Sequence, residues 1–126
     1  MPWGRRYKEE MIKKRCSYKA EKRDNGLRVT LQGEIDHHTA IAIRSEIDAM
    51  IYEERPRKLS LDMSEIDFMD SSGLGLIMGR YALMQKIGGE LSLISPNERI
   101  MKILKLAGLD RIIKIEEGEE NEKTGS

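Results

Sequence analysis

The chain of 126 residues contains one cysteine, one phenylalanine and one tryptophan, and its 22 basic residues balance 22 acidic residues. A single cysteine, Cys16, cannot form a disulfide within the chain, and no activating pattern surrounds it, which predicts an inert thiol. A formal net charge of zero provides no overall field that would attract nucleic acid or an anionic membrane. The sequence also lacks an apolar run as long as a signal peptide or a membrane span, so we expect a protein of the reducing cytoplasm.

Complete enzyme motifs are missing as well. Gly73-x-Gly75 lacks the third glycine of a dinucleotide-binding fingerprint, and close helix packing through Gly75 and Gly79 explains these glycines better. Ser71 does not stand in a nucleophile elbow, because Met69 occupies the first glycine position that this turn requires. We therefore expect a protein that is not an enzyme and has no small-molecule substrate, with a small nucleotide hydrolase as the enzymatic alternative.

The only two histidines, His37 and His38, are adjacent in the sequence and lack a third ligand at metal-site spacing. We expect their side chains to diverge on a surface loop, without a metal or another cofactor. The basic residues before Lys19 have few aromatic residues among them, which argues against direct binding of nucleic acid.

The spacing of apolar residues alternates between the periods of strands and helices. Asn25-Gly26 predicts a hairpin turn, with an antiparallel partner strand over residues 17–24. The expected elements that follow are strands over residues 27–31, 59–63 and 91–94, helices over residues 39–54, 71–87 and 96–107, and a short last strand or helix over residues 112–115. A hairpin followed by helix–strand repeats predicts an α/β domain with a mixed sheet, antiparallel at its start and parallel later.

The two ends of the chain differ from this pattern. Residues 1–16 are basic and irregular and predict a flexible extension, whereas residues 117–126 are acidic and predict a disordered tail. The folded domain is therefore expected over residues 17–116.

Two predicted loops, residues 33–39 and 64–72, follow neighbouring strands and are expected to lie side by side at the carboxyl ends of these strands. In the second loop, Asp70, Ser71 and Ser72 stand where an apolar helix begins. A serine at a helix start can cap the helix, and the unpaired N–H groups there can also accommodate a phosphate. A capped helix without further function and a phosphate-accepting site both agree with this pattern.

The segments Gly33-Glu34-Ile35-Asp36-His37-His38-Thr39-Ala40 and Phe68-Met69-Asp70-Ser71-Ser72-Gly73-Leu74-Gly75 resemble those of anti-sigma factor antagonists, the STAS-domain proteins of bacterial partner-switching systems. The resemblance covers residues 19–116, and the Asp-His-His-Thr-Ala loop points to the sporulation branch of the family. It implies a STAS fold, in which a mixed sheet of four to five strands packs with about four α-helices.

The resemblance also implies a function in the regulation of transcription. Ser71 corresponds to the serine that an anti-sigma factor, itself a serine kinase, phosphorylates with ATP, and a serine phosphatase removes the phosphate. ATP is then a substrate of the kinase and not a cofactor of this chain. The unphosphorylated protein binds the anti-sigma factor and releases the sigma factor, and phosphorylation ends this binding. The alternatives within the fold are a scaffold or antagonist of a general stress response and a STAS module that serves a transporter.

Around Ser71, we expect Asp70 and Ser72 to orient the loop and cap the helix, and Gly73 and Gly75 to allow close approach of the backbone. The expected partner-binding surface comprises Asp36, His37, His38, Thr39, Met69, Asp70, Ser72, Gly73, Leu74 and Gly75.

Overall fold

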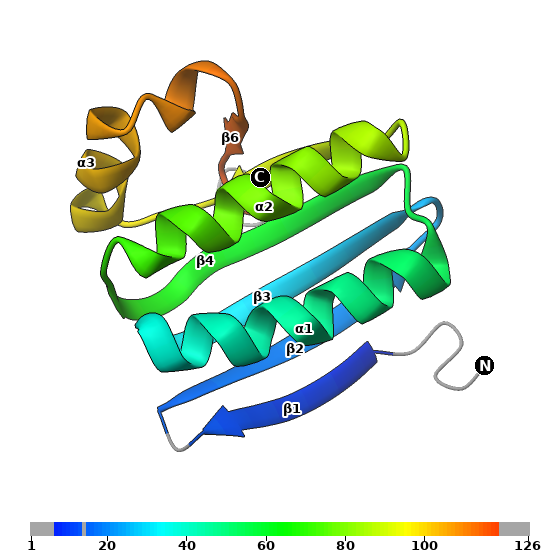
Figure 1. Cartoon of the computed structure of the whole chain (residues 1–126), viewed down its shortest axis with the longest axis horizontal. Coiled ribbons are helices and arrows are strands. Elements are labelled where there is room, and N and C mark those ends of the chain that lie inside the picture. The colour runs from blue at the N-terminus through cyan, green and yellow to red at the C-terminus, as the bar shows by residue number, and fades with distance from the viewer. Residues whose placement is uncertain (1–6, 14, 119–126) are drawn as a thin grey trace, which may run out of the picture.

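A computed structural model describes residues 7–13 and 15–118 of the chain. Over these residues the elements are β1 (Tyr7–Lys13), β2 (Cys16–Arg23), β3 (Gly26–Ile35), α1 (His37–Glu54), β4 (Lys58–Met69), α2 (Ser72–Lys86), β5 (Glu90–Ile94), α3 (Glu98–Leu106), a 3-10 turn (Leu109–Arg111) and β6 (Lys114–Glu116). The strands form one sheet in the order β1-β2-β3-β4-β5-β6 (Figure 1). The pairs from β1 to β3 are antiparallel and those from β3 to β6 are parallel, so the predicted mixed α/β sheet is confirmed.

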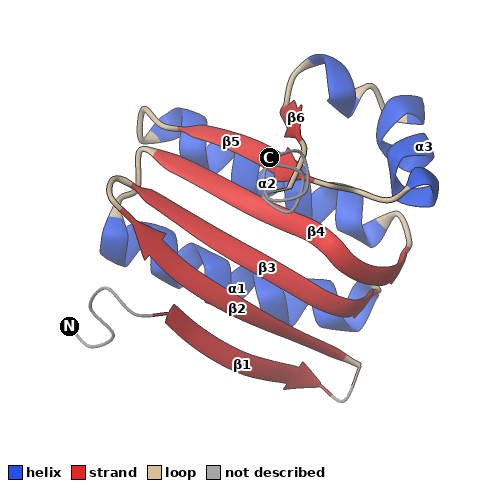
Figure 2. Ribbon diagram, turned by 180° about the vertical axis from the view of Figure 1, so that it is seen from behind, coloured by secondary structure: helices blue, strands red, loops and turns tan. Residues whose placement is uncertain are grey.

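Helices α1 and α2 lie side by side on one face of the sheet (Figure 1). Strands β2, β3 and β4 are uncovered by any described helix on the opposite face, and α3 lies beyond one end of β5 (Figure 2). The hydrophobic core fills the space between the sheet and the two helices. Its fully buried members include Ile43, Ile47, Ile51, Ile77, Met84, Val29, Leu31, Leu59 and Leu61. Burial of each such side chain contributes about 1.5–3 kcal/mol to folding.

The predicted hairpin is present, but its turn begins one residue earlier than the sequence suggested. Arg23 pairs with Gly26, so Asp24 and Asn25 form the turn and Gly26 begins β3. Asp24 adopts the positive φ of 49° that such short turns require at their first position.

The prediction of a flexible extension over residues 1–16 is wrong for residues 7–13, which form strand β1 beside β2. Residues 1–6 and 14 lie outside the described part of the chain. The sequence of β1 is rich in charged residues and lacks the alternating apolar pattern that predicts a strand. Edge strands commonly carry such charged residues, which discourage pairing with other chains. The acidic tail expected from residue 117 lies outside the described residues from residue 119 onward.

The two predicted loops are much shorter in the structure. Strand β4 continues through Met69, with two shifts of its register against β3 that mark bulges. Met63, Ile66 and Met69 are buried at a spacing of three residues. A regular strand buries every second residue, so this half of β4 does not show the pattern that predicts a strand. Only Asp70 and Ser71 connect β4 to α2, and only Asp36 separates β3 from α1.

Helix α2 presents one face to the core, with Leu74, Tyr81 and Ile87 packed against it. Leu76, Ile77 and Met84 are in the core, whereas Met78 is exposed. No described atom lies within 4 Å of an ideal Cβ at Gly75 or Gly79, so the predicted close packing through these two glycines is wrong.

Arg80 is the unexpected member of the buried face of α2. Its Nε lies 2.9 Å from Asp48 Oδ1 in α1, and its Nη1 donates to the carbonyl oxygen of Leu76 at 3.4 Å. Burial lowers the pKa of Arg80, and the charge of Asp48 opposes this shift. The ion pair therefore joins the two helices that cover the sheet.

Helix α3 also begins later than predicted. Asn97 is its N-cap and accepts a hydrogen bond from Ile100 N at 2.9 Å, so Pro96 precedes the helix instead of occupying its first turn. Ile100 and Leu104 are buried, whereas Ala107 is exposed.

Candidate functional site

The starts of α1 and α2 meet at the edge of the sheet where β3 and β4 end. Ile35 pairs with Met69 as the last residue of each strand. The next N–H along the chain, that of Asp70, donates to the carbonyl oxygen of Ile35 at 3.1 Å. The structure thus places Asp36 beside Asp70 and Ser71, as expected for two parallel strands that end together.

Asp36 and Thr39 form a capping box at the start of α1. Thr39 N donates to Asp36 Oδ1 at 3.0 Å, and Asp36 N donates to Thr39 Oγ1 at 2.9 Å. The hydrogen bond from the Thr39 backbone lowers the pKa of Asp36, and the Arg15 guanidinium lowers it further against the opposing effect of desolvation. Asp36 is therefore held as a carboxylate at the edge of the site.

His37 and His38 form the first turn of α1, so the expectation that they lie on a loop is wrong. Both are exposed, and their rings do not diverge as expected, since the ring centroids are 5.7 Å apart with an angle of 63° between the planes. Among the described residues, no three His, Cys, Asp or Glu side chains are grouped as metal ligands. The two imidazoles instead extend the surface beside Ser71.

Asp70, and not Ser71, provides the side-chain cap of α2. Asp70 Oδ1 accepts a hydrogen bond from Ser72 N at 2.8 Å. Ser71 occupies the N-cap position, but its side chain makes no capping hydrogen bond to the described helix. The Ser71 hydroxyl is exposed at the end of the helix and is not required to hold the backbone there.

A shallow hollow of about 250 Å³ lies between the first turns of the two helices. It is lined by His37, Ala40, Ile41, Arg44, Ser72, Gly75 and Leu76. Because Gly75 has no side chain, the backbone of α2 is accessible there. Three apolar side chains of the elements that frame the site are also exposed, with 49% of Ile41, 48% of Phe68 and 38% of Met78 accessible to solvent.

The predicted partner-binding residues divide into two groups by their exposure. Exposed or partly exposed are Asp36, His37, His38, Asp70, Ser72, Leu74 and Gly75, whereas Thr39, Met69 and Gly73 are buried. An ideal Cβ at Gly73 would lie 2.3 Å from Met69 Cγ, so Gly73 permits close packing inside the molecule. The three buried residues support the surface from below and do not offer their side chains to a partner.

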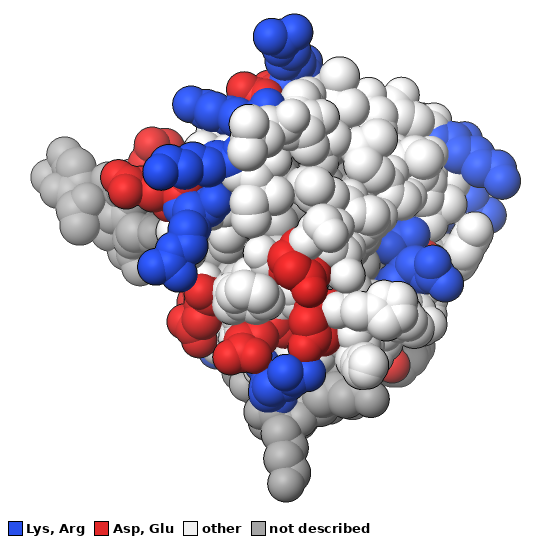
Figure 3. Space-filling model, turned by 60° about the vertical axis from the view of Figure 1, so that its left-hand side comes forward, with Lys and Arg blue, Asp and Glu red and all other residues white. Residues whose placement is uncertain are grey.

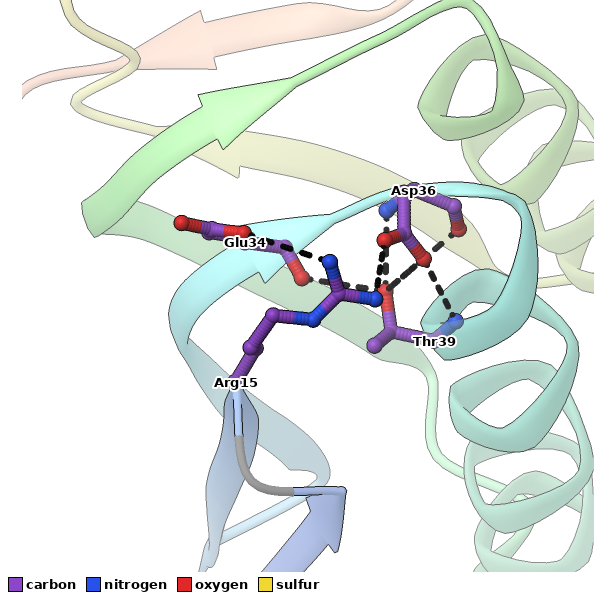
Figure 4. A network of polar contacts seen from close by, with 4 residues as sticks. All are labelled: Arg15, Glu34, Asp36 and Thr39. Atoms are coloured by element: carbon purple, nitrogen blue, oxygen red, sulfur yellow. Dashed lines mark hydrogen bonds and ion pairs between the residues drawn. The ribbon is translucent and has the colours of Figure 1, made fainter.

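Arg15, which the sequence did not predict as a site residue, lies at the same end of the molecule (Figure 4). Its Nη2 is 2.5 Å from Asp36 Oδ2, and its Nη1 is 3.7 Å from Glu34 Oε1. Arg15 precedes β2 in a segment that was expected to be flexible, and no motif in the sequence connects it to Asp36. The exposed apolar residues were missed too, since apolar spacing predicts burial and not exposure.

The surface at this end combines acidic and uncharged areas. Figure 3, which brings the starts of α1 and α2 forward, shows Asp and Glu side chains gathered below an uncharged area, with Lys and Arg side chains toward its margins. Such a surface fits a protein partner that offers both apolar and cationic groups.

Nearby, Cys16 begins β2 and is buried. Burial, with a smaller contribution from the charge of Asp36, raises the pKa of its thiol to about 11. At neutral pH the thiol is protonated, which agrees with the predicted inert role. No helix in the described part of the chain combines the length and the apolar character needed to cross a bilayer.

Comparisons with known proteins place this arrangement in a family. The STAS domain family model matches residues 17–122. The anti-sigma F factor antagonist of Paenibacillus polymyxa is 39% identical over 96 residues, which cover 76% of this chain and 82% of the relative. Relatives of this kind are named as regulators and not as enzymes, in line with the predicted absence of an enzymatic role.

Two solved structures of SpoIIAA share the fold. The unphosphorylated form, described as an anti-sigma factor antagonist, matches with a TM-score of 0.72 and 27% identity over 86% of this chain and 97% of that chain. The phosphorylated form of the Bacillus protein matches with a TM-score of 0.68 and 27% identity over 86% of this chain and 96% of that chain. With a family match over most of its length and a mixed sheet covered by two helices, the chain belongs to the STAS domain family.

Proposed function

We propose that the chain is an anti-sigma factor antagonist whose unphosphorylated form binds an anti-sigma factor and so releases a sigma factor. The proposed anti-sigma factor is a serine kinase that phosphorylates Ser71 with ATP, and a serine phosphatase reverses this step. ATP serves the kinase, and this chain has no cofactor of its own. We place the protein in the cytoplasm and its role in the control of transcription during sporulation, in keeping with the anti-sigma F antagonist among its relatives.

The observation that carries this proposal is the exposed hydroxyl of Ser71, which is not engaged in the cap of α2. The Asp70 carboxylate caps the helix instead, through Ser72 N. A kinase can therefore modify Ser71 without removing a hydrogen bond that holds the start of α2. The helix terminus also tolerates the added phosphate, because the positive end of the helix dipole favours an anion.

Although the helix tolerates the phosphate on Ser71, the same phosphate opposes the binding of a partner. Phosphorylation adds a charge of about −1.5 to −2 and three acceptor oxygens at the centre of the surface. Asp36 and Asp70 already make this surface acidic, and the apolar side chains of Ile41 and Phe68 lie exposed on the elements around it. A partner that fits a neutral hydroxyl there would have to bury or displace a dianion, and each 1.4 kcal/mol of that cost weakens binding about tenfold. The switch needs no rearrangement of the fold.

The proposal is tested by incubating the purified chain with ATP and candidate anti-sigma factor kinases, followed by measurement of intact mass. We expect one added phosphate on the wild type and on the Ser72→Ala variant, and none on Ser71→Ala. Ser72→Ala is the matched control, because it removes a hydroxyl from the adjacent, half-buried residue. Phosphate on Ser71→Ala would refute the site.

Binding to the same kinase in the presence of ADP tests the switch itself. Unmodified protein and Ser71→Ala are expected to bind with similar affinity, whereas the phosphorylated protein and Ser71→Asp bind more weakly. Equal affinities of the phosphorylated and unmodified proteins would contradict the proposed mechanism.

A further inference from the structure

Arg15 comes from a segment that precedes the family match and nevertheless reaches the candidate site. The STAS match begins at residue 17, and Arg15 lies between β1 and β2, just outside it. Its guanidinium forms ion pairs with Asp36 and Glu34, both at the end of β3 (Figure 4). The chain thus adds a cation of its own to the acidic part of the surface.

The backbone of Arg15 is fixed at this place by two contacts with β3. Glu34 N donates to the carbonyl oxygen of Arg15 at 2.9 Å. Gly33, with a φ of 101°, lets the same carbonyl approach so closely that an added Cβ would lie 2.1 Å from the oxygen. The start of the Arg15 side chain is therefore held near Asp36 even when the guanidinium moves.

The ion pairs themselves remain accessible. About 52% of the Arg15 side chain is exposed, compared with 21% of the Asp36 side chain and 43% of the Glu34 side chain. Exposed ion pairs of this kind are weak, so another cation can displace the guanidinium from the carboxylates. Arg15 also reduces the formal charge of the group Glu34, Asp36 and Asp70 from −3 to −2.

We propose that Arg15 is a specificity-determining residue that competes with the cations of a docking partner for the carboxylates of Asp36 and Glu34. The inference rests on the proposed function for the identity of the surface, and it adds how the surface discriminates among partners. A partner that approaches with guanidinium groups must displace Arg15 or use the second oxygen of each carboxylate. Partners that dock mainly through apolar contacts over Ile41, which lines the hollow between α1 and α2, do not meet this competition.

The competition is measured first without any kinase, with a tetra-arginine peptide as a probe of cation binding. Titration of the full ¹⁵N-labelled chain, followed by NMR at the amides of residues 34–36, gives the affinity of each variant. Arg15→Ala is expected to bind the peptide about two- to fivefold more tightly than the wild type, and Arg15→Lys to fall between them.

Arg23→Ala is the matched control, because it removes the same charge from the opposite end of β2, where Arg23 pairs with Glu21 at 3.1 Å. This position lies roughly 26 Å along the strand from Arg15, at about 3.3 Å per residue. A purely structural role for Arg15 predicts lower stability without tighter binding. Equal or weaker binding of the peptide by Arg15→Ala, relative to Arg23→Ala, would overturn the proposal.

A second arm uses the kinase that binds the wild type in the test above. At low salt the kinase is expected to bind Arg15→Ala more tightly than the wild type. This difference in affinity should disappear as the salt concentration is raised, because salt screens the interactions between exposed charges. If no kinase binds the wild type, the proposed function fails while the peptide titration still decides the role of Arg15.

Discussion

Replacement of Gly33 by alanine tests the part of the fold that fixes Arg15 beside the site. Gly33 has a φ of 101°, which an alanine adopts only with strain of about 1–3 kcal/mol. Its new Cβ would lie 2.1 Å from the Arg15 carbonyl oxygen, and backbone atoms cannot yield as a flexible side chain does. The carbonyl must move by more than 1 Å to reach ordinary contact, roughly 3.4 Å or more between such atoms.

That movement breaks the hydrogen bond from Glu34 N to Arg15, now 2.9 Å long. Its loss adds about 0.5–1.5 kcal/mol to the strain. We therefore expect Gly33→Ala to reduce the free energy of unfolding by about 2–4 kcal/mol. For a chain of this length, the melting temperature should fall by roughly 8–16 °C.

Chemical denaturation and a thermal melt monitored by circular dichroism measure this effect. Gly79→Ala is the matched control, since Gly79 lies within helix α2 and no described atom is within 4 Å of its ideal Cβ. The same substitution there should stabilise the protein by about 0.5–1 kcal/mol, because alanine favours the helix. If Gly33→Ala changed stability by less than 0.5 kcal/mol, or if both variants shifted it in the same direction, the reasoning would be refuted.

Two further predictions concern charged groups. Because the folded protein lowers the pKa of Asp36, the carboxylate contributes stability above its unfolded pKa, and that contribution is lost as pH falls through the folded pKa. Asp36→Asn keeps a capping side chain without the charge, so urea denaturation should show it less stable than the wild type at pH 6, with the difference shrinking at acid pH; a difference independent of pH would disprove the assignment. Asp48→Ala leaves the buried guanidinium of Arg80 without its ion-pair partner, which should cost about 3 kcal/mol in the free energy of unfolding. The double variant Asp48→Ala/Arg80→Met should recover much of that loss, and a double variant no more stable than Asp48→Ala would contradict the argument.

The sequence predicted the fold class because most elements follow simple apolar spacing. Alternating residues identified the middle of β3 and the first half of β4, and helical spacing identified α1 and α2. Spacing failed in the second half of β4, where bulges place buried residues three apart, and in β1, where charged residues occupy an edge strand. In both places the contacts with a neighbouring strand, and not the local pattern, determine the conformation.

For the site, the sequence by itself determined which chemical groups stand at the ends of two parallel strands: a carboxylate at Asp36, and an acid with two hydroxyls at Asp70, Ser71 and Ser72. Topology then requires these groups to be neighbours, because parallel strands end at the same edge of a sheet. Only the tertiary structure decided that Asp70 caps α2 while Ser71 is exposed. The tertiary structure also determined that Arg15 reaches Asp36. The position of the Arg15 side chain depends on the register of β2 against β3, and composition and apolar spacing do not specify this register.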